Sequence, residues 1–270
     1  MAVWGIVPAA GAGTRIQPLA FSKELLPVGF RRDGSGVERP RAVSEFLVER
    51  LAAGGADRLC FVIAPGKSDI LEYYGGSALG RPVCYVVQPR PSGLCDAVFR
   101  AAPLIRDDDR VLVGLPDTVW FPIPALRTLP GDRLGLLLFP SERPELFDAV
   151  ETDGSGAVRR IDVKQPLVRS RWIWGAMGMP GHVLLALRRL WHERSCRDEY
   201  LGTLIHAFIE AGGSATGVRT GRAYVDVGTP LGYRQALELV EQHVRPPAVG
   251  TPAKGGAEQD AAHVEVPPAS

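Results

Sequence analysis

The stretch VWGIVPAAGAGTR, residues 3–15, decides the fold class of this chain. Its apolar first half, Val3 to Pro8, has the length and composition of a buried β-strand. A loop of small residues follows directly, and backbone N–H groups in such a loop can approach a phosphate chain without obstruction by side chains. Arg15 ends the loop and Lys23 follows in the run SKELLPV, so both add positive charge. The pattern predicts a strand followed by an anion-binding loop, with contacts from Ala10, Gly11, Gly13 and Thr14.

Two other glycine-rich motifs fit this loop poorly. The dinucleotide-binding motif needs a third glycine, but Ile16 stands in its place. That motif also needs an acidic residue at the end of the second strand, whereas the chain there reads Ala64-Pro65-Gly66. The ATPase loop ends in Gly-Lys-Ser or Gly-Lys-Thr, which residues 8–15 lack. A nucleotide-dependent oxidoreductase is therefore the weaker alternative.

Short apolar runs alternate with segments of helical periodicity, which is typical of βαβ units around a mostly parallel sheet. Strands are predicted at 3–8, 58–64, 83–88, 111–115, 134–139, 157–163, 173–179 and 223–227. Helices are predicted at 43–53, 68–74, 94–102, 182–193, 198–211 and 231–243. The strands become shorter and more irregular from residue 134 onward. The sequence thus predicts an α/β fold in which helices flank a mostly parallel sheet.

Composition and charge exclude several classes of protein. The 31 basic and 30 acidic side chains give a net charge of +1, so the chain lacks the basic field that non-specific nucleic-acid binders use. No run of about 18 apolar residues is present to span a bilayer, so a cytoplasmic protein without membrane contacts is expected. The four cysteines and five histidines show no metal-ligand spacing. A tail at 246–270, rich in Pro, Gly and Ala, is expected to be disordered.

Further blocks follow the first loop in a fixed order. They are Gln88-Pro89 before Gly93-Leu94, Leu115-Pro116-Asp117, Lys164 before Pro166, and Asp226-Val227-Gly228-Thr229-Pro230. Together with Gly11-Ala12-Gly13-Thr14-Arg15 and Lys23, these blocks resemble the sugar-phosphate nucleotidyltransferase family, above all its glucose-1-phosphate thymidylyl- and uridylyltransferases. The resemblance implies a Rossmann-like α/β fold. It also implies a single domain over residues 1–245, with a nucleotide-binding half at 1–130 and an acceptor-binding half at 131–245.

The resemblance implies an enzyme that joins a nucleoside triphosphate, dTTP or UTP, to a sugar 1-phosphate and releases pyrophosphate. Such a displacement brings anions together, so charge cancellation and alignment supply most of the catalysis. Arg15 is expected to hold the leaving pyrophosphate, Lys23 the α-phosphate, and Lys164 the phosphate of the acceptor. Asp117 and Asp226, at the ends of two predicted strands, are expected to bind Mg²⁺. The nucleophile is already ionised at neutral pH, so the reaction needs no general base.

Two further groups of residues are assigned by the same resemblance. Gln88 and Gly93 are expected at the base, because a glutamine amide can match the edge of a base and a glycine lets the backbone approach. Asp148, Lys164 and Gly175 are expected to contact the acceptor.

Three positions of the acceptor half depart from the family pattern. Val163 stands where thymidylyltransferases carry a glutamate that contacts sugar hydroxyls, Asp148 stands at a glycine position, and Met177 at a tyrosine position. The acceptor is therefore left open between sugar and cyclitol phosphates, with glucose 1-phosphate as the first hypothesis. A regulatory protein that binds nucleotides without turnover is a second alternative, although it would not need the retained charged residues. A homo-oligomer is compatible with the sequence.

Overall fold

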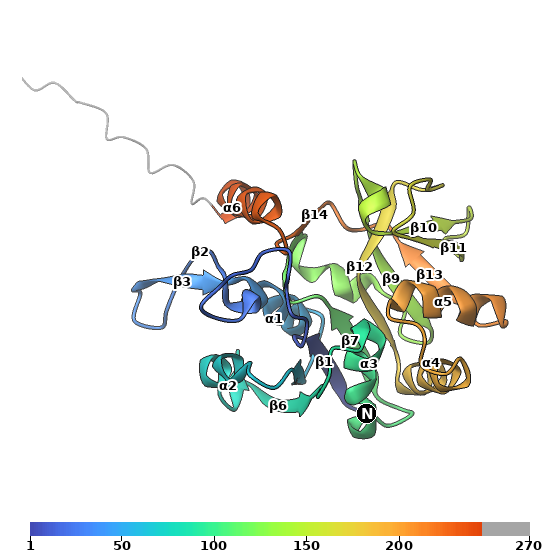
Figure 1. The fold of residues 1–270 in the computed structure, drawn as a ribbon, viewed down its shortest axis with the longest axis horizontal. Helices are drawn as coiled ribbons and strands as arrows, with labels where there is room; N and C mark the ends of the chain where they lie inside the picture. The colour runs from blue at the N-terminus through green and yellow to red at the C-terminus, as the bar shows by residue number, and fades with distance from the viewer. Residues whose placement is uncertain (245–270) are drawn as a thin grey trace, which may run out of the picture.

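The structure is a computed structural model that describes residues 1–244, and ten strands in this range form one central sheet (Figure 1). The tail expected at 246–270 lies outside the described residues. Four neighbouring strands form the parallel part of the sheet, in the order β7 (Arg110–Gly114), β1 (Val3–Pro8), β4 (Arg58–Ile63) and β6 (Arg81–Val87). β1, β4 and β7 are apolar almost throughout because both of their faces are covered, whereas β6 is partly exposed. The expected α/β class is confirmed.

Helices lie on both faces of the sheet (Figure 1). One face packs against α3 (Gly93–Arg100), α4 (Gly181–Glu193) and α5 (Leu201–Glu210), and the other against α1 (Val43–Ala53) and α2 (Ser68–Tyr74). Successive residues of β1 show this division, because Ile6 packs in the first layer and Val7 in the second. Burying one such side chain stabilises the fold by about 1.5–3 kcal/mol. No helix within residues 1–244 combines the length and the apolar character that a membrane span requires.

The sheet continues into the second half of the chain through β12 (Trp172–Pro180). This strand pairs antiparallel with β7 and with β9 (Leu134–Pro140), and β9 pairs in parallel with β13 (Ala215–Val218). The start of β12 also pairs with β10 (Asp148–Thr152), which pairs with β11 (Val158–Val163). One continuous sheet therefore carries residues from both halves of the chain.

A small sheet joins two distant parts of the chain. β8 (Thr118–Phe121) pairs antiparallel with β14 (Ala223–Asp226), which places Asp226 opposite Thr118. α6 (Pro230–Val244) follows β14 and packs on a hairpin formed by β2 (Pro27–Arg32) and β3 (Glu38–Ala42). Apolar residues of β2, β8, β14 and α6, together with two from α1, form a third buried cluster. The segments that follow β1, β7 and β14 meet near this cluster as a result.

Most predicted elements are present, with ends that differ by a few residues. The helix predicted at 198–211 begins at Leu201, because Asp198 instead accepts two hydrogen bonds from the Arg194 guanidinium at 2.7 and 3.0 Å. The sequence pattern misses β2, β3, β8, β10, β13 and the two-residue edge strand β5 (Ser77–Ala78). These strands are short, and all but β8 carry partly exposed side chains, so they contain no long apolar run.

Candidate active site

Four charged residues meet where β1, β7 and β14 end. Arg15 Nη2 lies 3.2 Å from Asp226 Oδ2, and Lys23 Nζ lies 2.5 Å from Asp117 Oδ2. Lys23 and Asp117 are largely buried, whereas the Arg15 side chain is 63% exposed. The residues expected to bind phosphate and those expected to bind a metal thus lie together as two ion pairs, which we call the charge cluster.

The pairing of β8 with β14 positions the two carboxylates of the charge cluster. Asp117 stands in the turn between β7 and β8, and its carbonyl accepts a hydrogen bond from the amide of Val227 at 2.8 Å. Asp226 Oδ1 accepts one from the amide of Gly228 at 2.7 Å, which orients the side chain at the end of β14. A Cβ at Gly228 would lie 2.8 Å from that oxygen and 2.9 Å from Arg15 Nη2, so any side chain here would displace the ion pair.

Burial and charge oppose each other in the pair of Lys23 and Asp117. Burial lowers the pKa of Lys23, but the charge of Asp117, helped by Glu24 and Asp226, outweighs burial and holds that pKa above its usual value. Burial also raises the pKa of Asp117, yet Lys23 outweighs it and holds that pKa below its usual value. Both groups are therefore charged at neutral pH, and they act as fixed charges.

The loop after β1 presents backbone amides beside the charge cluster. Within residues 1–244, the amides from Ala10 to Arg15 donate to no protein acceptor. Gly13 has φ +66°, and a Cβ there would lie 2.7 Å from Lys23 Cδ, so the turn and the close approach both require glycine. A Cβ at Gly11 would lie 3.8 Å from Lys23 Nζ. Successive backbone amides whose N–H groups have no protein acceptor and lie next to a lysine can bind an anion.

A second lysine, which sequence reasoning missed, contacts this loop. Lys67 Nζ donates to the carbonyls of Ala9 and Gly11 at 2.7 and 2.8 Å, and it contacts both carboxylate oxygens of Glu24 at 2.9 and 2.8 Å. Glu24 is 1% exposed, and burial raises its pKa while Lys67 and Lys23 lower it. The sequence does contain a feature that could have identified Lys67 as a site residue, because this lysine follows a predicted buried strand in a Gly-Lys-Ser triplet.

Gln88 directly follows β6, and Gly93 is the first residue of α3. The Gln88 side chain is 3% exposed, and its Nε2 donates to the carbonyl of Gly93 at 3.1 Å and to Asp96 Oδ2 at 2.8 Å. These bonds use both N–H groups of the amide and leave its oxygen for a ligand. Gly93 has φ +86°, and a Cβ there would lie 2.7 Å from Glu199 Cα, so glycine allows the chain before α5 to approach. Sequence reasoning did not single out Asp96.

The residues expected to bind the acceptor lie on or beside β10, β11 and β12. Asp148 and Val163 are direct partners across the ladder of β10 and β11. Asp148 Oδ2 accepts a hydrogen bond from the indole N–H of Trp174 at 3.1 Å. Burial raises the pKa of the Asp148 carboxyl, although Trp174 and Lys164 act to lower it. Lys164 has φ +46°, and its ammonium lies 4.2 Å from the centre of the Tyr200 ring.

Two other positions of this half are explained by packing. A Cβ at Gly175 would lie 2.4 Å from Cε2 of Tyr224 and 2.8 Å from Cε2 of Phe139, so glycine makes room for these rings. The Tyr224 ring also lies edge-on to Phe147, with the ring centres 5.9 Å apart. Met177 is fully buried and packs in the layer that includes α3, α4 and α5. Methionine in place of the family's tyrosine at position 177 therefore changes the packing of the core.

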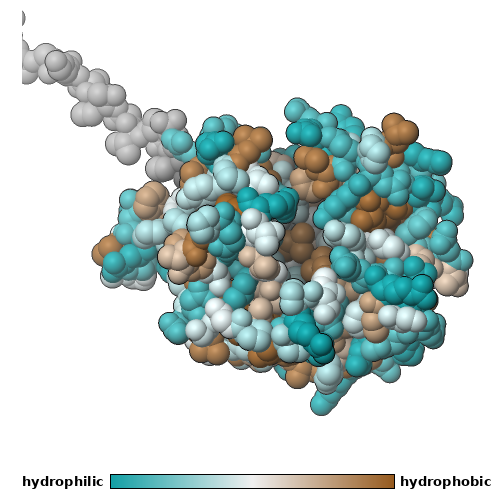
Figure 2. Space-filling model, in the orientation of Figure 1, coloured by the Kyte–Doolittle hydropathy of each residue, from teal (hydrophilic) through white to brown (hydrophobic). Residues whose placement is uncertain are grey.

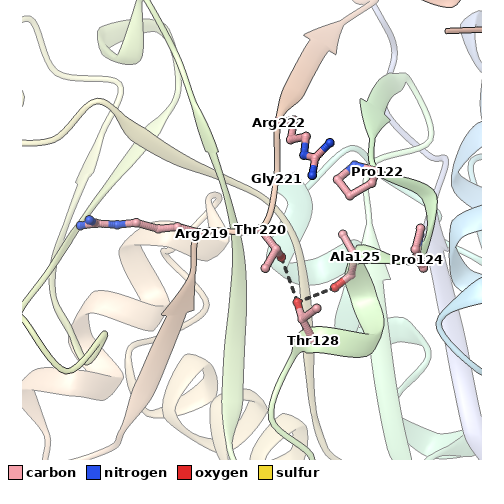
Figure 3. A pocket seen from close by; sticks show the side chains of 8 residues that line it. All are labelled: Pro122, Pro124, Ala125, Thr128, Arg219, Thr220, Gly221 and Arg222. Atoms are coloured by element: carbon pink, nitrogen blue, oxygen red, sulfur yellow. Dashed lines mark hydrogen bonds between the residues drawn. The ribbon is translucent and has the colours of Figure 1, made fainter.

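A cavity of about 670 Å³ lies beside the charge cluster. Its lining includes Arg15 and Asp226 from the cluster and Phe147 and Tyr224 next to them, whereas Asp148, Lys164 and Gly175 are not among the described residues that line it. The molecule is hollowed near the middle of the face shown in Figure 2. A separate cavity of about 380 Å³ lies beside the 3-10 helix at Ile123–Thr128, where the hydroxyls of Thr128 and Thr220 are 2.9 Å apart (Figure 3). The larger cavity is the better candidate for a substrate.

Asp117 and Asp226 fit a magnesium ion by their chemistry. Mg²⁺ takes oxygen ligands, commonly one or two carboxylates together with phosphate oxygens and water. A cation bound here would compete with Lys23 and Arg15 for the same carboxylate oxygens. In the described part of the chain, no group of three or more His, Cys, Asp or Glu side chains could hold a metal. A metal at these two carboxylates would therefore need further ligands from the substrate.

Comparisons with known proteins identify the family. The model of the nucleotidyl transferase family matches residues 4–243. A glucose-1-phosphate thymidylyltransferase of Neisseria meningitidis serogroup A is 27% identical over 248 residues, which are 88% of this chain and 82% of that protein. A Bacillus anthracis protein crystallised with sucrose matches with a TM-score of 0.74 at 21% identity, over 88% of this chain and 95% of that chain. A UTP-bound UGPase from Acinetobacter baumannii matches with a TM-score of 0.70 at 19% identity, over 91% and 95%. Because the family model covers almost all of the described residues, the chain belongs to the nucleotidyl transferase family.

Proposed function

We propose that this enzyme transfers a nucleotidyl group from dTTP or UTP to a sugar 1-phosphate and releases pyrophosphate. The observation that carries the proposal is the charge cluster, in which two cations and two carboxylates meet beside a loop whose amides donate to no acceptor in the described part of the chain. Two of the similar proteins support the choice of substrates, since one is a glucose-1-phosphate thymidylyltransferase and the other binds UTP.

The proposed reaction is an in-line displacement at the α-phosphorus. An oxygen of the acceptor phosphate forms a new bond to that phosphorus, and the bond to the bridging oxygen of pyrophosphate breaks. The amides of Ala10 to Arg15 and the Arg15 guanidinium hold the leaving phosphates, and Lys23 holds the α-phosphate. Magnesium, when bound by Asp117 and Asp226, would supply further positive charge to the phosphate oxygens. Arg15 is exposed enough to turn from Asp226 to a phosphate.

For the base, the remaining hydrogen-bonding capacity of Gln88 supports thymine or uracil. Its two N–H groups are already bound within the protein, so its side-chain oxygen is the atom left for the base. That oxygen can accept a hydrogen bond from the N3–H group that thymine and uracil share.

On the acceptor side, Lys164 would hold the phosphate and Asp148 a hydroxyl group. The thymidylyltransferases that this chain resembles carry a glutamate at the position of Val163. Asp148 lies directly across the strand ladder from Val163, so a carboxylate is present on the other strand of the same pair. An ionised carboxylate only accepts hydrogen bonds, which suits the hydroxyl groups of a sugar or a cyclitol.

A screen of pyrophosphate release tests the proposal. The common nucleoside triphosphates are each combined with a panel of sugar and cyclitol phosphates in the presence of MgCl₂, and the products are identified by mass. Pyrophosphate should appear only when dTTP or UTP is combined with a sugar phosphate, together with the corresponding nucleotide sugar. Absence of release with every pair, or equal release without an acceptor, would contradict the proposal.

A further inference from the structure

Lys67 is surrounded by protein oxygens and is 13% exposed. An ammonium group has three N–H donors, and four oxygens from Ala9, Gly11 and Glu24 lie within 2.9 Å of its nitrogen. All of its donors are therefore used within the protein. Lys67 is not a phosphate ligand in this arrangement, which distinguishes it from Lys23.

The two carbonyl contacts of Lys67 determine where the loop directs its donors. In a trans peptide, the C=O of one residue and the N–H of the next point in opposite directions. The carbonyls of Ala9 and Gly11 point toward Lys67, so the N–H groups of Ala10 and Ala12 point away from it. Those two N–H groups belong to the run that donates to no protein acceptor within residues 1–244.

The contact with Glu24 links Lys67 to the charge cluster. Glu24 directly follows Lys23 in a short 3-10 turn, Lys23–Leu25, and is almost completely buried. Holding the Glu24 carboxylate therefore also holds the turn that places Lys23 on Asp117. The buried charges of Lys67 and Glu24 cancel, and removal of one partner would leave the other as an uncompensated buried charge.

We propose that Lys67 is a positioning residue for nucleotidyl transfer, with Glu24 as its counter-charge. It fixes the loop carbonyls away from the substrate and the loop amides toward it, and it fixes the turn that carries Lys23. The inference rests on the proposed role of the loop at 10–15 in binding the triphosphate. Loss of Lys67 lets the carbonyls of Ala9 and Gly11 rotate, so that oxygen atoms meet the phosphates in place of N–H groups.

Three variants test this role. Lys67→Met removes the ammonium and leaves Glu24 unpaired, whereas Glu24→Gln/Lys67→Met removes both charges and leaves no buried ion alone. Arg41→Met is the matched control, because Arg41 is also 13% exposed and forms an ion pair at 2.8 Å with Glu49, away from the loop. For each variant, calorimetry gives the Kd of dTTP and of UTP, steady-state kinetics give kcat and KM for both substrates, and thermal unfolding gives Tm.

Lys67→Met should raise the Kd of the nucleotide by about 10-fold or more, the scale of a lost charge-assisted hydrogen bond, and leave the acceptor KM nearly unchanged. The double variant should recover Tm but still bind nucleotide weakly, because no ammonium holds the carbonyls. Arg41→Met should lose Tm without a change in nucleotide binding. If Lys67→Met does not fold, the Kd of the nucleotide for the double variant is the deciding measurement.

Normal nucleotide binding by the double variant would overturn the inference, because Lys67 would then only neutralise Glu24. Normal nucleotide binding by Lys67→Met, with a lower Tm as the only effect, would also overturn the inference. A wild-type protein that binds no nucleotide and releases no pyrophosphate would count against the proposed function instead. Failure of the inference and failure of the proposed function are thus distinguishable.

Discussion

The nucleotide side and the acceptor side of the candidate site hold their lysines in different ways. On the nucleotide side, Lys23 rests on Asp117 at 2.5 Å and Lys67 on Glu24 at 2.8 Å. On the acceptor side, the ammonium of Lys164 lies over the Tyr200 ring at 4.2 Å, and within residues 1–244 it forms no ion pair with a carboxylate. One side therefore has lysines fixed by buried ion pairs, and the other has a lysine against an aromatic ring.

The difference indicates where the enzyme is preorganised. A lysine held by a buried carboxylate starts close to its place in the complex, so it needs little rearrangement when the phosphate chain and a cation arrive, and such preorganised charges contribute strongly to catalysis. An exposed contact between an ammonium and a ring contributes only about 0.5–1 kcal/mol, so Lys164 can leave Tyr200 at little cost. A rigid side suits a triphosphate chain, which has the same structure in every nucleoside triphosphate, and an adaptable side suits an acceptor that must enter and leave.

The largest effect is expected from the carboxylates of the charge cluster. Asp117→Ala and Asp226→Ala should each lower kcat by roughly 100-fold or more with magnesium present, the scale of a lost preorganised transition-state contact. Asp117→Ala should also lower Tm more than Asp226→Ala, because it leaves the largely buried Lys23 unpaired, whereas Arg15 is exposed. Steady-state kinetics and thermal unfolding measure both effects.

The matched control for this pair is Asp132→Ala, which removes a carboxylate from an exposed ion pair with Arg133. It should change neither kcat nor Tm appreciably, because water screens an exposed ion pair and the pair adds little to stability. Turnover near the wild-type rate in both cluster variants would remove the metal assignment and, with it, the contrast between a preorganised and an adaptable side.

Intermediate effects should separate the two sides directly. Arg15→Ala should weaken nucleotide binding, whereas Lys164→Ala should leave it unchanged, raise the acceptor KM and slow transfer. A charge-assisted hydrogen bond contributes about 1.5–3 kcal/mol, so changes of roughly 10- to 100-fold are expected. Calorimetric titration with nucleotide, together with kinetics that vary the acceptor, measures both. If Lys164→Ala abolishes nucleotide binding and leaves acceptor kinetics normal, the acceptor site is misplaced.

The sequence predicts the parallel part of the sheet well and the site only in part. β1, β4 and β7 are apolar on both faces, so their positions follow from composition alone. Arg15, Lys23, Asp117 and Asp226 stand in motifs at strand ends, which is why they could be selected. Their pairing could not be predicted, because the contact between Lys23 and Asp117 spans 94 positions and depends on how β7 and β8 are placed.

Other features of the site depend on packing that the sequence does not display. Lys67 has its role because the turn after β4 lies beside the loop after β1 and the Glu24 carboxylate. The sequence gives Gln88 two donors and an acceptor, but Asp96 and Gly93 take the donors. Val163 and Asp148 look like two independent departures from the family pattern until the register of β10 and β11 makes them partners.

The smallest effect is expected from Asp148→Asn on the acceptor side. Burial raises the pKa of Asp148 in the folded chain above the value of about 3.9 for an unfolded aspartate. Between these two pKa values the folded chain keeps a proton that the unfolded chain has lost, so the free energy of unfolding of the wild type falls as pH rises. Asparagine cannot ionise and still accepts the indole N–H of Trp174. The variant should therefore gain stability relative to the wild type as pH rises through this window.

Denaturant unfolding of both proteins on either side of this window measures the difference, and Asp132→Asn is the control. The hydrogen bond from Arg133 lowers the pKa of Asp132, so any pH effect of this variant has the opposite sign, and the exposure of the ion pair keeps it small. If Asp148 also accepts a hydroxyl of the acceptor, Asp148→Asn should raise the acceptor KM a few-fold, by roughly the 0.5–1.5 kcal/mol of one hydrogen bond, and leave nucleotide binding unchanged. A stability difference that does not change with pH would contradict the raised pKa of Asp148. An effect on nucleotide binding would show that Asp148 does not belong to the acceptor side.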